Sequence, residues 1–143
     1  MSFNSDLLDH YVERYNAGDL DTCMDLYADD AVQLMHDGLF VGRAEIQERL
    51  ARDLTAFPDA TYTVASFVEQ GGAFADEWTF TGTNDGPFLL PDGTQVPATG
   101  KRVEIRGMEL VQMRDGKIIV DNLYYDMAGA LIQLGLVPQP AAA

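Results

Sequence analysis

Residues 102–126 read RVEIRGMELVQMRDGKIIVDNLYYD, two β-rich runs separated by the dipeptide Asp115-Gly116. Asp-Gly between two such runs is a strong signal for a two-residue hairpin turn of type I′. Because the turn type fixes the strand register, the pairing of every later residue can be counted from it. The stretch therefore predicts an antiparallel pair of strands at 102–114 and 117–125.

Counting back from Arg114 opposite Lys117 assigns each side chain of the pair to one of two faces. One face is apolar except for four polar side chains: Glu109, Asn122, Tyr124 and Asp126. We interpret this face as the concave, pocket-lining one. Burial in an apolar cone raises the pKa of a carboxyl, which makes Glu109 or Asp126 a usable general acid or base. These two residues are the predicted catalytic pair.

Other interpretations of the same carboxylates remain open. A β-bulge at Gly107 would shift the register beyond it, which weakens the assignment of Asp126 more than that of Glu109. Asp126 stands just before an expected helix and can be its N-cap. Glu109 can instead lie at the rim, hydrogen-bonded and inert. Asp121 falls on the opposite, convex face in this register and is not included in the site.

Three more side chains are candidates for substrate binding, together with Asn122 and Tyr124. His36 follows the apolar face of a short strand, where a satisfied core histidine is the competing interpretation. Tyr15 belongs to a helical stripe and can be a core residue whose hydroxyl reaches the cavity. Trp78 is read as core or as pocket wall.

The remainder of the chain changes from helical to strand periodicity at Thr61. Three helices are expected before Thr61. The first ends at Gly18, the second is capped by Asp19, and the third ends at Pro58. Strands are expected at 32–36, 61–69 and 73–83, a loop at 84–100, and a last helix from Met127 to Gly135. This is an α+β layout, a cone-shaped, curved antiparallel sheet wrapped around N-terminal helices, with one domain at 1–137 and a tail at 138–143.

Composition excludes several classes of function. The 143 residues carry a net charge of −14, which disfavours nucleic acid and anionic membrane surfaces as partners. One cysteine and two histidines leave no internal disulfide, zinc–thiolate cluster or three-histidine zinc site. No phosphate-binding glycine loop, membrane span or signal peptide is found. We therefore expect a cytoplasmic protein without metal or cofactor that binds a hydrophobic small molecule.

Several segments, in this order, resemble SnoaL-like polyketide and ester cyclases of the nuclear-transport-factor-2-like superfamily. Residues 81–87, TGTNDGP, resemble the family's TGTHxG, and residues 97–104, PATGKRVE, resemble its PPTGRRVE. Residues 114–118, RDGKI, match DGKI, and Tyr124-Tyr125-Asp126 with LIQLG at 131–135 is similar to YWD…LLxQLG. NAGDL at 16–20 and YADDAV at 27–32 are general to the superfamily. The resemblance spans nearly the whole chain.

The resemblance implies a ketosteroid-isomerase-like fold and a cofactor-free cyclase that closes a ring by intramolecular aldol condensation of a polyketide ester. It assigns the acid/base role to Asp126. Two positions depart from the family pattern, because Asn84 replaces a usual histidine and Asn122 stands where a basic residue is common. Two alternatives are a non-catalytic protein that binds hydrophobic ligands, and an epoxide hydrolase on the same fold using Arg102, Glu104 and Asp126.

The convex face of the same hairpin has an apolar middle and charged ends, which is typical of a dimer contact. Arg106 and Arg114 stand at its rim. A contiguous apolar area of this size is unusual on the surface of a monomer, and the resemblance implies that two copies of the chain pair through that face. We therefore predict a homodimer through a patch of five side chains: Met108, Leu110, Ile119, Leu123 and Tyr125.

Overall fold

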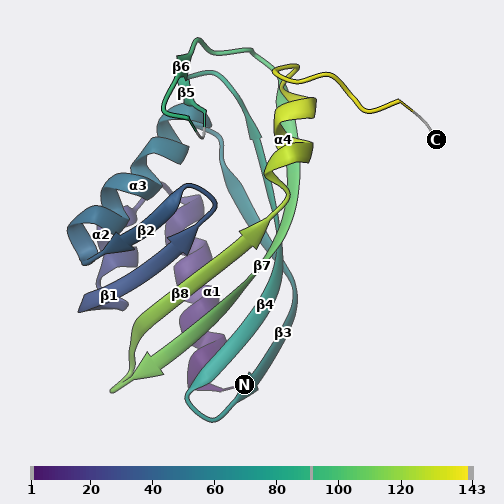
Figure 1. Ribbon diagram of the computed structural model, residues 1–143. Helices are drawn as coiled ribbons and strands as arrows, with labels where there is room; N and C mark the ends of the chain where they lie inside the picture. Colours follow the sequence, from purple (N-terminus) through teal and green to yellow (C-terminus); the bar gives the residue numbers. More distant parts are fainter. Residues whose placement is uncertain (1, 91, 142–143) are drawn as a thin grey trace.

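The computed structural model of the chain describes residues 2–90 and 92–141 (Figure 1). Its elements, in chain order, are α1 (Phe3–Asn16), α2 (Leu20–Met24), β1 (Tyr27–Met35), β2 (Gly38–Val41), α3 (Arg43–Ala56), β3 (Thr61–Gln70), β4 (Ala73–Thr83), β5 (Phe88–Leu89), β6 (Gln95–Val96), β7 (Arg102–Arg114), β8 (Lys117–Tyr125) and α4 (Met127–Gln133).

A six-stranded sheet in the order β2-β1-β8-β7-β4-β3 forms the body of the protein. Its strands pair antiparallel, except that β1 runs parallel to β8. Helix α1 contacts β3 and helix α3 contacts β1. Helix α4 packs on the beginning of β7, near Glu104 (Figure 1). The predicted α+β class, a curved sheet with N-terminal helices, is confirmed.

The predicted strand bounds at 73–83, 102–114 and 117–125 agree with the structure. The short strand expected at 32–36 is longer and ends one residue earlier, because β1 runs from Tyr27 to Met35. The loop at 84–100 contains the small hairpin β5–β6. Residues 138–141 of the expected tail form no helix or strand, residues 142–143 lie outside the described residues, and the division at residue 137 stays a prediction.

The β7–β8 hairpin contains a bulge that the turn chemistry did not predict. Met113 faces Ile118 as expected, but Gln112 then faces Val120, which leaves Ile119 without a partner in β7. One extra residue in β8 moves every later side chain of that strand to the other face. The pairing that was predicted beyond the bulge is therefore wrong, and the bulge considered at Gly107 is not observed.

The shift changes which β8 side chains face the helices. Glu109 faces Leu123, not Asn122, and Gly107 faces Tyr125, not Tyr124. Asp121 is 3% exposed and Leu123 is 7% exposed, whereas Tyr124, predicted to line the pocket, is 54% exposed. The β7 faces are as predicted, with Val103, Ile105 and Val111 buried.

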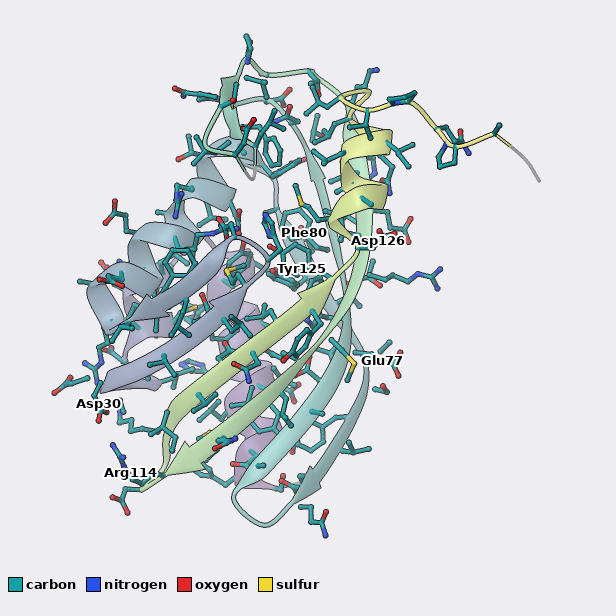
Figure 2. All side chains as sticks on the ribbon, viewed as in Figure 1. Asp30, Glu77, Phe80, Arg114, Tyr125 and Asp126 are labelled. Carbon is teal, nitrogen blue, oxygen red and sulfur yellow. The ribbon has the colours of Figure 1, made fainter. Side chains whose placement is uncertain are left out.

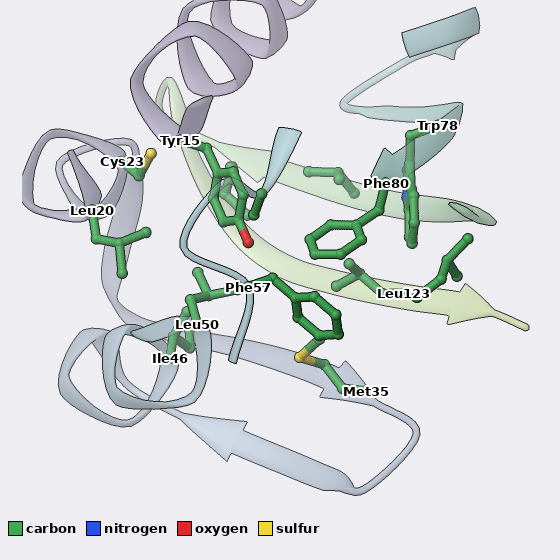
Figure 3. Packing of buried hydrophobic residues seen from close by; sticks show 14 of the residues in the cluster. Tyr15, Leu20, Cys23, Met35, Ile46, Leu50, Phe57, Trp78, Phe80 and Leu123 are labelled. Carbon is green, nitrogen blue, oxygen red and sulfur yellow. The ribbon is translucent and has the colours of Figure 1, made fainter. Parts of the chain in front are cut away.

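The core fills the space between the sheet and α1–α3 (Figure 3). Its aromatic rings meet edge to face, with centroids 4.7 Å apart for Tyr15 and Tyr62 and 5.0 Å for Tyr62 and Trp78. Edge-to-face contacts of this kind are favourable beyond the area that they bury. Over the described ranges, none of the helices combines the length and the apolar character that crossing a membrane requires.

Asn84, the position where the family usually has histidine, fastens the 84–100 loop to α3. Its amide Nδ2 donates to the carbonyl oxygens of Ala56 at 3.1 Å and Gly86 at 2.9 Å. Its Oδ1 accepts from the backbone N–H and the hydroxyl of Thr99, both at 2.9 Å. With every polar atom used and no exposed surface, Asn84 serves the structure of the loop.

Candidate functional site

A pocket opens between α3, α4, the β5–β6 hairpin and the β1–β2 turn, and we call it the mouth pocket. It holds about 690 Å³ of space between the atoms, the open solvent at its mouth included. Most of its wall is aromatic or aliphatic, including Phe57, Tyr62, Trp78, Phe80, Phe88 and Ile105. Such a wall suits a flat hydrophobic molecule.

Tyr62 and Trp78 also line a second, smaller pocket closer to α1, which we call the inner pocket. Apart from the shared Tyr62 and Trp78, the inner pocket has three polar side chains, those of Tyr11, Asp76 and Glu109. The rest of its lining is apolar. The two pockets are thus neighbours across one pair of aromatic rings, and the inner one ends at carboxylates.

Three acidic side chains from three adjacent strands meet at this depth, and we call them the acid cluster: Asp76, Glu109 and Asp121. Asp76 on β4 lies directly opposite Glu109 on β7. Asp121 on β8 accepts at Oδ2 from the hydroxyl of Tyr27 at 2.8 Å and from Nε2 of Gln33 at 3.2 Å. The bulge at Ile119 is what turns Asp121 inward to join the other two.

Burial and the repulsion of neighbouring carboxylates favour the protonated forms of Glu109 and Asp76. The pKa of Glu109 is raised well above its usual value, first by burial and then by the charge of Asp121. Burial, with repulsion from Asp121, raises the pKa of Asp76 to about 6. The two groups titrate as a coupled set, so the cluster holds a proton on Glu109 while Asp76 exchanges one near neutrality.

The acid cluster is also poorly satisfied by hydrogen bonds. With Glu109 ionised, both carboxylate oxygens of Asp76 and Oδ1 of Asp121 are buried without a donor among the described residues, and Nε1 of Trp78 is buried without an acceptor. A proton on Glu109 supplies one donor to Asp76. Buried polar groups in folded proteins almost always have partners, and the exceptions call for a functional explanation. Within residues 2–90 and 92–141, no group of three or more His, Cys, Asp or Glu side chains is arranged to hold a metal ion.

A second polar centre lies in the wall of the mouth pocket, around Arg49. Arg49 is 5% exposed, and its Nε lies 2.9 Å from Oδ2 of Asp37 in the β1–β2 turn. Its Nη1 lies 2.8 Å from Oδ1 of Asp53, one helical turn along α3. The two ion pairs join α3 to the turn that carries His36.

His36 and Tyr125 form a hydrogen-bonded pair in the same wall. Nδ1 of His36 contacts the Tyr125 hydroxyl, and the rings meet edge to face with centroids 5.2 Å apart. Burial lowers the pKa of His36, so the ring is neutral at pH 7. The predicted pocket position of His36 thus agrees with the structure, and Tyr125 joins it from β8.

The structure divides the residues predicted from the sequence into two groups. Glu109 lines the inner pocket, Trp78 lines both pockets and His36 lines the mouth. Tyr15 is fully buried in the core, with its hydroxyl unpartnered among the described residues. Asn122, Tyr124 and Asp126 line neither pocket, because the bulge turns the first two outward.

Asp126 is the N-cap of α4, the alternative interpretation of its position. Its Oδ1 accepts from the backbone N–H of Gly129 at 2.8 Å, and the side chain is exposed. Figure 2 shows it at the junction of β8 and α4, one residue beyond Tyr125. Arg102 and Glu104 are exposed on the convex face, as the register had placed them, so the trio of the epoxide-hydrolase alternative is not assembled in a pocket.

Sequence reasoning missed Asp76, Asp121, Tyr125 and Arg49. Asp76 carried a signal, because it interrupts the alternating aromatic residues Phe74, Trp78 and Phe80 on the inward face of β4. Arg49 carried one too, since it stands in the apolar stripe of α3 beside Ile46 and Leu50. A charged residue at a position that the pattern buries indicates a paired or functional group.

Comparisons with known proteins identify a family for the chain and show that its fold is shared. A family model described as SnoaL-like polyketide cyclase matches residues 5–134. The structure of IdmH from Streptomyces antibioticus, named as a candidate polyketide cyclase, is 30% identical with a TM-score of 0.77, covering 92% of this chain and 97% of its own. That of AclR from Streptomyces galilaeus, named as a candidate hydroxylase, is 28% identical with a TM-score of 0.81, covering 94% and 86%.

A SnoaL-like protein from Jannaschia sp. CCS1 is 20% identical with a TM-score of 0.83, covering 95% of this chain and 94% of its own, which shows the shared fold. A search among curated proteins found no match.

Proposed function

Because the chain belongs to the SnoaL-like polyketide cyclase family, we propose that it is a cofactor-free acid/base enzyme that closes a ring in a polyketide ester. One observation carries the proposal: an apolar pocket adjoins three carboxylates, of which Asp76 and Asp121 are buried and Glu109 is half-buried, and the pKa values of Asp76 and Glu109 are raised. The likeness to IdmH supports the substrate class. The cytoplasmic location expected from the sequence stays a prediction.

In the proposed reaction, the Asp76 carboxylate takes a proton from the carbon next to a carbonyl group. The C–H electron pair becomes the double bond of an enolate, whose oxygen accepts a hydrogen bond from protonated Glu109. The enolate carbon then attacks a second carbonyl carbon of the same molecule, and the oxygen of that carbonyl takes up a proton. One C–C bond forms and the proton count is unchanged, so no cofactor is required.

The apolar walls contribute by holding the chain bent, with its two reacting carbons close together. Bringing two groups of one molecule into reacting geometry is a large part of the barrier in ring closure. Excluding water from the inner pocket also strengthens the hydrogen bond from Glu109 to the enolate oxygen.

The test is hydrogen–deuterium exchange at C2 of 1-tetralone, an apolar bicyclic ketone, followed by ¹H NMR in D₂O. We expect the wild-type protein to accelerate exchange, and Glu109→Gln to lower that rate by roughly 10²–10⁴-fold, the usual contribution of an acid/base group. Asp126→Asn is the matched comparison, because the family resemblance assigns the acid/base role to Asp126. We expect it to retain exchange.

The reverse result, with loss of exchange in Asp126→Asn and retention in Glu109→Gln, would assign the chemistry to Asp126 and end the proposal for the acid cluster. Absence of exchange with all three proteins, while 1-tetralone binds, would favour the non-catalytic ligand-binding alternative. Circular dichroism and thermal unfolding of each variant exclude loss of fold as the cause.

We also propose a homodimer through the convex face. The bulge changes which side chains make up the apolar patch on that face. Leu123 and Tyr125 of the predicted patch face inward, and Ile119 lies at the bulge. The exposed apolar side chains of that face, which we call the convex patch, are Leu39, Val41, Val68, Met108, Leu110 and Tyr124. Arg114, expected at the rim, pairs with Asp30 at 3.1 Å.

Sedimentation velocity at micromolar concentration tests the dimer. We expect the wild type to sediment as a dimer and Leu110→Asp as a monomer, because a charge in the middle of an apolar interface costs several kcal/mol, on the order of 2–5. Phe3→Asp, a change at an apolar side chain on α1 that is more exposed than Leu110, is the control and is expected to stay dimeric. A monomeric wild type would contradict the assignment.

A further inference from the structure

The mouth pocket has a polar centre that the proposed proton transfer does not use. The Tyr125 hydroxyl faces His36, and the charge of Arg49 also acts on it, partly offsetting the burial that raises the pKa of this phenol. Both neighbours are fixed, since Arg49 is held by Asp37 and Asp53 and His36 belongs to the same turn as Asp37. The phenol therefore stays protonated and is oriented at the polar centre of the wall.

The space around this phenol is kept open by Gly107, which pairs with both Trp78 and Tyr125. A Cβ at position 107 would lie 2.6 Å from Cζ2 of Trp78 and 2.7 Å from Cβ of Tyr125. The glycine thus lets the two aromatic side chains, whose ring centroids are 5.8 Å apart, lie over the strand. Trp78 also lines the inner pocket, so Tyr125 lies beside a ring that the two pockets share.

We propose that the Tyr125 hydroxyl is a hydrogen-bond donor for a second carbonyl oxygen of the substrate, at the mouth end of the pocket. The substrate class is then a flat hydrophobic molecule with two separate carbonyl groups, one at the acid cluster and one at Tyr125. The role of the second carbonyl in the reaction rests on the proposed function, because ring closure needs one carbonyl to form the enolate and another to be attacked. The recognition itself stands without catalysis.

The chemistry of the wall favours a neutral carbonyl over an anion. Arg49 is already neutralised by two carboxylates, and burial holds His36 neutral, so the centre has no spare positive charge for a carboxylate ligand. Arg52 lines the same mouth, but its guanidinium lies over the ring of Phe40, 5.7 Å from the centroid. When neutral His36 carries its proton on Nδ1, the ring donates to the Tyr125 oxygen, and the single O–H of the phenol is left to donate to a carbonyl oxygen.

The experiment compares two ligands of nearly equal shape, 1,4-diacetylbenzene with two carbonyl groups and 4-ethylacetophenone with one, by isothermal titration calorimetry. We expect the wild type to bind the diketone about tenfold more tightly, the effect of one buried hydrogen bond. Tyr125→Phe is expected to reduce that ratio to near one, mainly by weakening the diketone. Tyr124→Phe, one residue away on the other face, is the matched control and is expected to keep it.

His36 is proposed as a positioning residue for this phenol, and the same ratio tests it. His36→Ala keeps the hydroxyl but frees it to rotate, so we expect a ratio between those of the wild type and Tyr125→Phe. An unchanged ratio in His36→Ala would end the positioning role. An unchanged ratio in Tyr125→Phe would overturn the recognition site, provided that the variant unfolds at a similar temperature.

The outcomes separate this inference from the proposed function. If 1-tetralone shows no exchange but Tyr125→Phe still abolishes the preference for the diketone, the recognition site stands and the acid/base proposal falls. If exchange depends on Glu109 but the preference is the same in Tyr125→Phe and wild type, the catalytic proposal stands and the second carbonyl site falls.

Discussion

Asp76→Asn should stabilise the protein at pH 8 while removing most of its ability to exchange a proton. The pKa of Asp76 is raised from 3.8 to about 6 in the folded protein, so the folded state binds more protons than the unfolded state between those values. By linkage, the free energy of unfolding is highest below about pH 4 and falls as the pH rises through about 6. An asparagine has no proton to lose and escapes this penalty.

The expected gain for Asp76→Asn at pH 8 is roughly 2–3 kcal/mol, from about 1.4 kcal/mol per pKa unit, and it should vanish near pH 4. Urea unfolding at both pH values measures it. We expect the exchange of 1-tetralone to fall by about 10²-fold or more in the same variant. A gain in stability with a loss of activity is typical of a strained functional site.

Glu77→Gln is the matched control, because Glu77 is the next residue of β4 and its exposed side chain lies on the other face. Its Oε1 accepts a hydrogen bond from Ser66 at 3.1 Å, which a glutamine oxygen can keep. We expect its stability to change by less than about 0.5 kcal/mol. If Asp76→Asn is destabilised at pH 8, or equally stabilised at pH 4, Asp76 is not held in a high-energy ionised state.

Arg49→Leu should lower the free energy of unfolding by about 3–5 kcal/mol at pH 7, the usual cost of breaking a buried ion pair from one side. The change leaves Asp37 and Asp53 without their partner. Burial already raises the pKa of Asp53, and Arg49 opposes that effect, so removing the guanidinium raises it further. The loss should therefore shrink as the pH falls and the carboxyl takes up a proton.

Chemical denaturation at pH 7 and pH 4.5 measures this loss. Arg52→Leu is the control, because Arg52 lines the same pocket but is exposed, and we expect a change of less than about 1 kcal/mol. Adding Asp53→Asn to Arg49→Leu should recover part of the lost stability, since it removes one unpaired charge. Equal losses in Arg49→Leu and Arg52→Leu would contradict the structural role of the ion pairs.

The β4, β7 and β8 strands and their order were predictable because periodicity and one Asp-Gly turn determine them. The faces of β8 were not, because Ile118, Ile119 and Val120 are three consecutive apolar residues, and such a run is compatible with either alternation. The bulge at Ile119 is decided by tertiary contacts, including the parallel pairing of β8 with β1. A local pattern does not contain that information.

The candidate site was predictable only in part for the same reason. Glu109 was placed on the correct face because the extra residue lies in β8 and leaves the alternation of β7 unbroken, although its partner across the pair is Leu123 and not Asn122. Asp121 and Tyr125 lie beyond the bulge, so both were assigned to the wrong face, and Asn122 and Tyr124 were assigned to the pocket in their place. Asp76 needed no register, since its place among alternating aromatic residues already indicated an inward carboxylate.

The central claim is that Asp76 and Glu109 transfer a proton inside an apolar pocket, and the pH profile of 1-tetralone exchange tests it most directly. The base must be ionised, so we expect the rate to rise with pH through about 6, the folded pKa of Asp76, and to fall again at higher pH as Glu109 loses its proton. The rising limb should be absent in Asp76→Asn. A wild-type profile that rises near pH 4 and is unchanged in Asp76→Asn would contradict the account.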